Sequence, residues 1–332
     1  YEEFGGVKPN PRLSFAREGV EKAIAFGAEL ILAVGGGSAI DTAKGIAIGA
    51  ANPGTDIWEF WKNKKELKTA LPVGTVLTIS AAGSEMSNSA VLTDEETQDK
   101  SGIGSDLIRP KFAIMNPELT YTIPKYQLTC GIVDIFMHTI ERYFTPVHGN
   151  ELTDEIAEGL MRTLIRNAAK AYENQEDYDA MSEIMWCGSI SHNGITGLGR
   201  PKDFLCHKLG HQLGAKFDEA HGATLSAVWG SWARYVYHLD EARFANYGRK
   251  VWNIDEENDE KTAVAAIEKT EEFFRSLHMP TCLGDMKMGV QPDEVLKEMA
   301  GKATAGDTMK VGAFQKMGAK ELYEIYKKAN HR

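Results

Sequence analysis

Residues 30–41 read Leu-Ile-Leu-Ala-Val-Gly-Gly-Gly-Ser-Ala-Ile-Asp, a short apolar run that passes directly into a glycine-rich turn. A continuous apolar run of this length is typical of a strand buried on both faces of a parallel sheet. The residues after the glycines favour a helix that extends to about residue 51, where Asn52, Pro53 and Gly54 stop it. We therefore predict a strand, a turn and a helix, the basic unit of an α/β domain.

The glycine turn is the first candidate binding element. Because residues 35–37 lack Cβ atoms, their backbone N–H groups can approach an anion, and the start of the helix adds partial positive charge. Glycine-rich turns also often serve only as connections, and this one lacks the G-x-G-x-x-G pattern of the usual dinucleotide-binding turn. Both interpretations stay open, and the position after a buried strand favours phosphate binding.

The rest of the chain divides into two regions. Before residue 120 we predict a helix over 11–27, strands at 73–79, 91–93 and 112–115, and a charged hairpin-like connection at 94–100. Beyond residue 124 the periodicity is helical only, and the predicted helices cover 125–144, 151–171, 178–197, 202–214, 223–238, 241–252, 261–277, 292–303 and 319–329. We predict an α/β domain over 1–120 followed by an all-α domain over 121–332.

The composition restricts the class of partner. The 332 residues are 43% hydrophobic and 25% charged, as in ordinary soluble globular proteins. A formal net charge of −10 argues against nucleic acid and anionic membranes, and no apolar run is long enough to span a bilayer. We expect a reducing cytoplasmic location, because the four cysteines are scattered and no C-x-x-C pair occurs among them; they are Cys130, Cys187, Cys206 and Cys282.

Histidines cluster in the helical region. His207 and His211 share one face of a predicted helix, and His221 follows shortly after; Asp134 and His138 have the same four-residue spacing in an apolar helix upstream. An unpaired carboxylate is costly to bury there. Alone, Asp134 and His138 are also consistent with a hydrogen-bonded pair. Together the five side chains are candidates for one site for Fe²⁺ or Zn²⁺, because no thiolate or further carboxylate takes part. We interpret the other histidines as structural or surface residues.

In their order along the chain, the motifs resemble those of the iron-containing, or group III, alcohol dehydrogenases, and among these the butanol dehydrogenases and broad-specificity aldehyde reductases. The resemblance covers nearly the whole chain and rests on Gly35-Gly36-Gly37-Ser38-x-x-Asp41, Gly83-Ser84-Glu85, Gly131-x-x-Asp134-x-x-x-His138, and His207-x-x-x-His211 with His221-Gly222.

The resemblance implies a dehydroquinate synthase-like architecture, with a Rossmann-like nucleotide-binding α/β domain, an all-α domain and the active site between them. In the family, a strand–helix–strand unit precedes the glycine turn. We expect this unit to be missing here, because the chain starts just before the helix that leads to the turn, and its loss would expose a sheet edge and apolar surface. Ala82 stands where the family has threonine, which removes one hydroxyl from the cofactor side.

The resemblance further implies a homodimeric, metal-dependent enzyme that transfers a hydride between NAD(P)H and a short-chain aldehyde or a primary alcohol such as butanol. It assigns the metal, Fe²⁺ or else Zn²⁺, to Asp134, His138, His207 and His221. His211 then lies beside the nicotinamide, either as a proton relay or only as a packing residue. The cofactor, NADP or NAD, is expected to contact Gly36, Gly37, Ser38, Asp41, Thr78, Ser84, Lys100 and Thr120.

Two alternatives stay open at this point. One is a glycerol dehydrogenase-like polyol oxidoreductase, which the four apparent ligands disfavour because three are expected there. The other is a non-catalytic remnant that binds a metal or a nucleotide.

Overall fold

The apolar run and the glycine turn form the centre of the first domain. In the computed structural model, which describes all 332 residues, strand β1 (Ile31–Gly35) is followed by helix α2 (Gly37–Ala51) after a single linking residue, Gly36. β1 pairs in parallel with β2 (Val73–Leu77), which pairs in parallel with β5 (Phe112–Ile114). The predicted strand–turn–helix unit is therefore confirmed.

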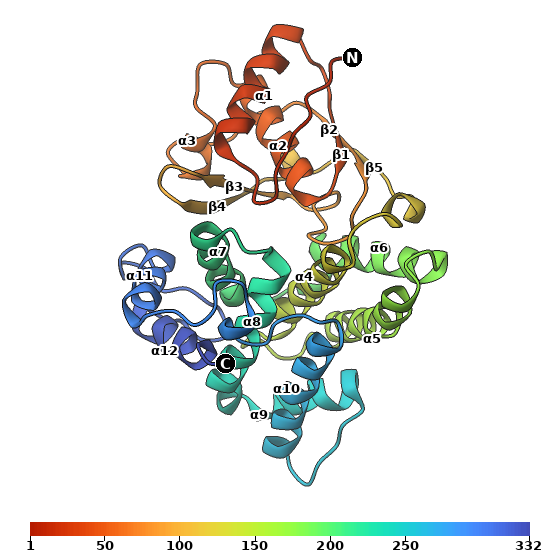
Figure 1. The fold of residues 1–332 in the computed structure, drawn as a ribbon, viewed down its shortest axis with the longest axis vertical. Coiled ribbons are helices and arrows are strands. Elements are labelled where there is room, and N and C mark those ends of the chain that lie inside the picture. The colour runs from red at the N-terminus through yellow and green to blue at the C-terminus, as the bar shows by residue number, and fades with distance from the viewer.

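Helices cover one face of this three-stranded sheet. α2 packs there through Ile40, Ala43 and Ala47 against Ala33, Val73 and Leu77 of the strands. α1 (Leu13–Phe26) and the short α3 (Trp58–Trp61) pack on the outer side of α2, together with the antiparallel hairpin of β3 (Ser89–Asp94) and β4 (Asp99–Gly104). Figure 1 shows this α/β region, red to yellow, at one end of the molecule.

The other face of the sheet is apolar and open to solvent. Leu32, Val34, Phe112 and Ile114 are between 46% and 63% exposed, and the registers Leu32↔Gly74↔Phe112 and Val34↔Val76↔Ile114 place them on one face. β1 also forms an edge of the sheet. Parallel sheets are ordinarily covered on both faces, so four exposed apolar side chains on one face are an unusual feature of this sheet.

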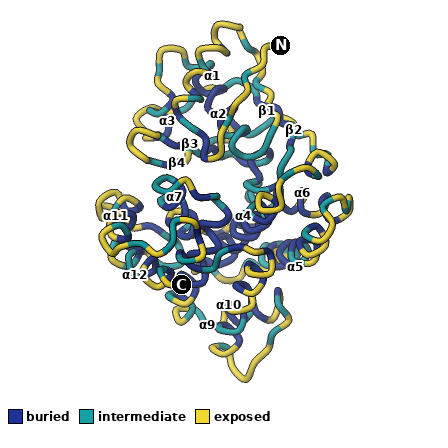
Figure 2. The backbone as a smooth tube through the Cα atoms, in the orientation of Figure 1, coloured by how far each residue is buried: buried dark blue, intermediate teal, exposed yellow.

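The second region is built from helices. They are α4 (Lys125–Tyr143), α5 (Glu151–Glu173), α6 (Tyr178–His192), α7 (Leu205–Phe217), α8 (His221–Val236), α9 (Glu241–Tyr247), α10 (Asp259–Ser276), α11 (Asp293–Ala303) and α12 (Ala319–Ala329). A single core of 53 buried residues joins them, and α4 lies at its centre (Figures 1 and 2). None of the helices combines the length and the apolarity needed to cross a bilayer. The predicted order, an α/β region followed by a helical one, is confirmed.

Three local predictions were wrong. The segment predicted as a connection over 94–100 is a four-residue turn that leads into strand β4. β4 was not predicted because its sequence is charged and contains glycine. The helix predicted over 178–197 ends at His192, because Gly194 adopts φ 107° before a 3₁₀ turn. The helix predicted over 241–252 changes at Gly248 into a π-helical segment that ends at the left-handed Asn253.

Candidate active site between the two domains

A cavity of about 1440 Å³ opens between the two domains. The α/β side contributes the N-terminal segment 1–11, β1, the start of α2 and the loop around residues 79–91. The helical side contributes residues of α4, α7 and α8. All five candidate metal ligands are among them, and His221 is the first residue of α8. Side chains that lie up to about ninety residues apart in the sequence therefore meet in one space.

Helix α4 brings Asp134 and His138 to the cavity from within the core. Both are 3% exposed, and their four-residue spacing places them on one face of the helix. α4 comes close to the loop that contains Ser80 because residue 131 is glycine: a Cβ there would lie 2.2 Å from the carbonyl oxygen of Ser80. One buried helix, α4, therefore places both Asp134 and His138 beside the cavity.

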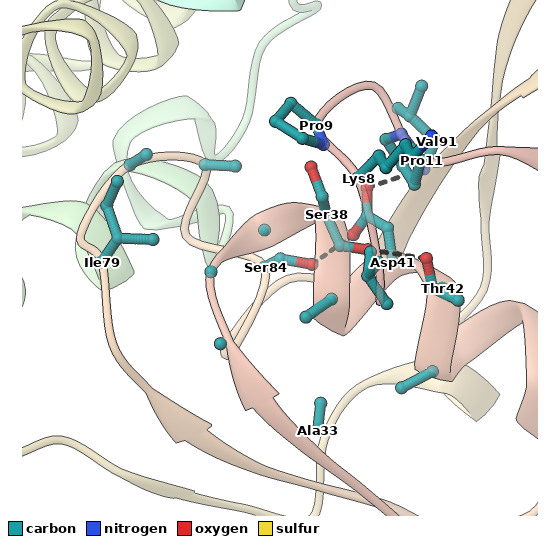
Figure 3. A pocket seen from close by; sticks show the side chains of 18 of the residues that line it. Lys8, Pro9, Pro11, Ala33, Ser38, Asp41, Thr42, Ile79, Ser84 and Val91 are labelled. Carbon is teal, nitrogen blue, oxygen red and sulfur yellow. Dashed lines mark hydrogen bonds between the residues drawn. The ribbon is translucent and has the colours of Figure 1, made fainter. Parts of the chain in front are cut away.

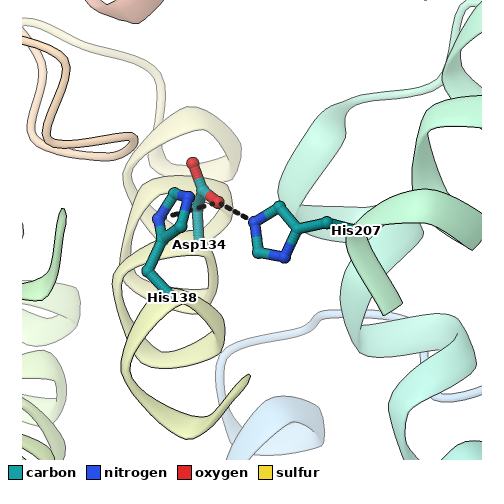
Figure 4. A group of neighbouring side chains, drawn as sticks. All are labelled: Asp134, His138 and His207. Atoms are coloured by element: carbon teal, nitrogen blue, oxygen red, sulfur yellow. Dashed lines mark ion pairs between the residues drawn. The ribbon is translucent and has the colours of Figure 1, made fainter. Parts of the chain in front are cut away.

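Helices α7 and α8 add the histidines. Asp134 Oδ1 lies 3.5 Å from His138 Nδ1, 3.6 Å from His207 Nε2 and 3.6 Å from His221 Nε2. Figure 4 shows Asp134 and His138 on α4 with His207 opposite them. Ligand atoms of these three residues all lie within 4.8 Å of one another. His221, with 26% of its side chain exposed, stands at the cavity side of this group.

The group contains an unusual number of buried polar atoms without a hydrogen-bond partner. They are Asp134 Oδ1, His138 Nδ1, His207 Nε2 and His221 Nδ1. Buried polar atoms are normally paired, since leaving one unpaired costs about 1–3 kcal/mol. Four such atoms in one place fit a site for a cation, and the donor set of one carboxylate and three imidazoles suits a borderline divalent metal.

The protein environment sets different protonation preferences for these histidines. Burial is the main reason that the pKa values of His138 and His221 lie well below the usual range, and neighbouring cationic groups add to this. His207 is different: burial lowers its pKa, but the carboxylates of Glu141 and Asp134 outweigh burial and raise the pKa of His207 to about 9. Glu141, which the sequence interpretation missed, is therefore part of the site.

His211 lies on the cavity side of α7, next to the other histidines. Its ring centroid lies 5.4 Å from that of His221 and 6.3 Å from that of His207, and no protein group hydrogen-bonds its ring. Burial, followed by the charge of Lys100, holds the pKa of His211 well below its usual range. The imidazole is therefore neutral and faces the space between the domains.

His192 is a second residue that the sequence interpretation underestimated. Its ring centroid lies 4.1 Å from that of His138, and it lines the same cavity. Its Nδ1 lies 2.6 Å from the carbonyl oxygen of Ala82 and its Nε2 lies 3.3 Å from Ser89 Oγ. Because both ring nitrogens have partners, His192 connects the segment of Ala82 and Ser89 to the histidine group instead of adding a ligand.

The start of α2 faces the cavity on the α/β side. Gly36, Gly37 and Ser38 line it, and no side chain caps the helix N-terminus. Asp41, one turn further, accepts hydrogen bonds from Ser84 Oγ and, at 2.9 Å, from the N–H of Val91 (Figure 3). Burial is the main cause of a raised Asp41 pKa. These contacts hold α2 against Ser84 and against β3 at Val91. The first backbone N–H groups of α2, which have no partner inside the helix, lie at the cavity.

The remaining predicted cofactor contacts fall into two groups. Lys100 lines the cavity, and its Nζ donates a hydrogen bond of 2.8 Å to Asn10 Oδ1. Thr78 and Thr120 lie outside the cavity lining. The Thr120 hydroxyl donates to the carbonyl oxygen of Pro117 inside its own 3₁₀ turn, and the N–H of Thr78 bonds to Gly35. A contact of these two threonines with the cofactor stays a prediction.

Comparison with known proteins gives a consistent result. A family model described as iron-containing alcohol dehydrogenase matches residues 1–117, and one described as the C-terminal part of the Fe-containing alcohol dehydrogenase family matches residues 129–330. NADH-dependent butanol dehydrogenase A of Clostridium acetobutylicum is 38% identical over 98% of this chain and 84% of its own length. NADPH-dependent aldehyde reductase YqhD of Escherichia coli is 38% identical over 85% of this chain and 74% of its own length.

A solved structure shows the same similarity in three dimensions. NADH-dependent butanol dehydrogenase A from Thermotoga maritima superimposes with a TM-score of 0.94 at 34% identity, over 99% of this chain and 83% of that one. The fold of this chain is therefore shared with a protein of that name.

Proposed function

The chain belongs to the iron-containing alcohol dehydrogenase family, and on that premise we propose how its cleft carries out NAD(P)H-dependent reduction of a short-chain aldehyde to a primary alcohol, and the reverse reaction. The relatives at 35–38% identity are butanol dehydrogenases and an aldehyde reductase. The observation that carries the proposal is the convergence of three imidazoles on Asp134 Oδ1 in the cavity that α2 also faces.

The proposed metal ligands are Asp134, His138, His207 and His221. They account for the unpartnered atoms of the site, and they suit Fe²⁺ or Zn²⁺ better than Ca²⁺ or Mg²⁺, which prefer more oxygen ligands. A divalent ion bound there supplies Lewis-acid polarisation of a substrate oxygen. The helical core around α4 excludes water from the buried side of the group and leaves the cavity as the route for substrate.

We propose that the cofactor lies along the α/β wall of the cavity. The free N–H groups of Gly36, Gly37 and Ser38 would bind the pyrophosphate, since a helix N-terminus attracts anions. Asp41, Ser84 and Lys100 would line the rest of the cofactor path. The nicotinamide carries the hydride, and the protein orients it. Both NADH and NADPH occur in the names of the relatives, so either nucleotide is a candidate.

His211 is the proposed proton relay. It faces the cavity as a neutral imidazole, next to His221 and without a hydrogen-bond partner in the protein. A neutral imidazole in this position can accept a proton from an alcohol or pass one on from solvent. The four cysteines are free thiols, which supports a reducing cytoplasmic location.

The direct test combines metal analysis with an assay of NAD(P)H oxidation in the presence of butyraldehyde. We expect the wild-type protein to hold one Fe²⁺ or Zn²⁺ per chain and to oxidise NAD(P)H, and we expect Asp134→Asn and His221→Ala to lose most of both. His148→Ala is the matched control, because His148 is an exposed histidine paired only with Asp240. Full activity and metal content in Asp134→Asn would contradict the proposed site.

A further inference from the structure

Glu141 is a fully buried carboxylate to which the proposed function assigns no role. It lies on α4, seven residues after Asp134 and three after His138, and is 0% exposed. Its side chain reaches the N-terminus of α7, the helix that carries His207. A buried carboxylate is costly unless hydrogen bonds compensate it, so its partners indicate its role.

The two oxygens of Glu141 have different partners. Oε1 accepts the N–H of Cys206 at 2.6 Å and the N–H of His207 at 3.4 Å, which caps the start of α7. Oε2 makes a short contact with Nδ1 of the His207 ring. The cap therefore uses one oxygen, and the other is left for the imidazole.

The two nitrogens of the His207 ring are correspondingly distinct. Nδ1 faces Glu141, whereas Nε2 faces Asp134 Oδ1 at 3.6 Å and has no hydrogen-bond partner (Figure 4). An ionised carboxylate can only accept hydrogen bonds, so the nitrogen that faces it carries a proton. The lone pair of the neutral ring is then on Nε2, which is directed at the other ligands.

We propose that Glu141 is a positioning residue that holds His207 with its proton on Nδ1 and its Nε2 lone pair toward the metal. The inference rests on the proposed metal site and adds to it the reason that His207 can serve as a ligand. One buried helix would then supply two ligands, Asp134 and His138, and the group that orients a third ligand from a different helix. Such partners typically change metal affinity by about 10–100-fold when they are removed.

Glu141→Gln separates orientation from capping. The amide oxygen of glutamine can still accept from the N–H groups of Cys206 and His207, so the cap on α7 is kept. The amide NH₂ then faces Nδ1 of His207 and donates to it, which moves the ring proton to Nε2, where it blocks the lone pair that the metal needs. We expect Zn²⁺ affinity, measured by competition with a chromogenic chelator, to fall by about 10–100-fold.

Glu158→Gln is the matched control. Glu158 is another buried glutamate of the helical domain, but its partners are the Tyr143 hydroxyl and Asn246, not a histidine. We expect the Zn²⁺ affinity of Glu158→Gln to equal that of the wild-type protein. A folded Glu141→Gln protein that bound Zn²⁺ as tightly as wild type would overturn the role of Glu141 and leave the metal site intact. A wild-type protein that bound no Zn²⁺ would overturn the metal site, and the inference with it.

A measurement on the unmodified protein covers the case in which Glu141→Gln does not fold. In Zn²⁺-loaded protein with ¹⁵N-labelled histidine, long-range ¹H–¹⁵N spectra identify which ring nitrogen of His207 is protonated. We expect the proton on Nδ1 and the metal on Nε2. The reverse assignment would overturn the proposal.

Discussion

Lys100 shows at the scale of one residue how burial adjusts a charge in the cavity. Its ammonium group is buried and hydrogen-bonded to Asn10, so its charge is compensated only by Asp134, Asp41 and Asp218, and is opposed by Arg12. Burial outweighs the favourable charges and lowers the pKa of Lys100 from 10.5 to about 8. A lysine in this state is cationic at neutral pH and loses its charge within a pH range in which the protein can be studied.

This shift predicts a pH dependence of cofactor binding. If Lys100 binds the nucleotide as a cation, the affinity for NAD(P)H is full below the lowered pKa and falls as the pH rises through about 8, by roughly tenfold between pH 7 and 9. Fluorescence titration with NADPH or NADH at the two pH values measures this. In Lys100→Met we expect weaker binding without that pH dependence. A wild-type affinity that is equal at pH 7 and pH 9 would rule out a cationic contact by Lys100.

At the scale of elements, two buried contacts of helices hold the walls of the cavity in place. Lys44 of α2 is 0% exposed, and its ammonium group donates to carbonyl and hydroxyl oxygens of Ser84, Ser87 and Ser89 at 2.7–3.2 Å. One lysine therefore holds together the loop that lines the cavity on the α/β side. On the other wall, α8 approaches α4 where Gly222 meets the backbone of Cys130.

The contact at Gly222 predicts a large effect from a single methyl group. A Cβ at residue 222 would lie 2.1 Å from the carbonyl oxygen of Cys130, so Gly222→Ala must push α8 away from α4 and move the adjacent His221. We expect a loss of about 1–3 kcal/mol in the free energy of unfolding, together with weaker Zn²⁺ binding. Urea denaturation and chelator competition measure the two effects.

The control for this prediction is Gly301→Ala. Gly301 lies inside α11, and a Cβ there would meet no atom within 4 Å. Replacing an unhindered helical glycine by alanine is expected to be neutral or to stabilise by up to about 1 kcal/mol. If Gly222→Ala behaved in the same way as Gly301→Ala, the close approach of the two helices would not be what places His221.

At the scale of the whole molecule, a network of hydrogen bonds connects the two domains beside the cavity. Asn10 and Arg12 of the α/β side both bond to Asp218 Oδ1 at the end of α7, at 2.9 and 3.0 Å. Asn10 and Asp218 each adopt a left-handed conformation with φ 54°, which asparagine and aspartate tolerate better than most residues. The same Asn10 holds Lys100, so the proposed cofactor contact depends on both domains.

Metal removal should therefore be visible in the stability of the molecule. The proposed ligands come from three helices that share one core, and an ion that binds only the folded state stabilises it by about 4 kcal/mol when its free concentration exceeds Kd a thousandfold. We expect a chelator to lower the Tm of the wild-type protein by several degrees and to leave Asp134→Asn unchanged. Differential scanning calorimetry with and without added Zn²⁺ measures this. A wild-type Tm that did not respond to verified metal loss would argue against a site in the core.

The sequence by itself determined the local structure and the candidate residues of this protein. The apolar run 30–34 and its glycine turn predicted β1 and α2, helical periodicity beyond residue 124 predicted the second domain, and four-residue spacing paired Asp134 with His138. These features could be predicted because helix and strand periods act over a few neighbouring residues. β4 was missed because its charged, glycine-containing sequence lacks the alternation of a strand.

The tertiary structure alone decided which of these residues meet. No spacing along the chain shows that Glu141 caps α7 and contacts His207, or that His192 packs on His138. Those relations depend on how closely α4, α7 and α8 approach one another, and glycines such as Gly222 set that approach through contacts between residues far apart in the sequence. The reason is physical: burial and close packing are properties of the assembled core, whereas periodicity is a property of each segment.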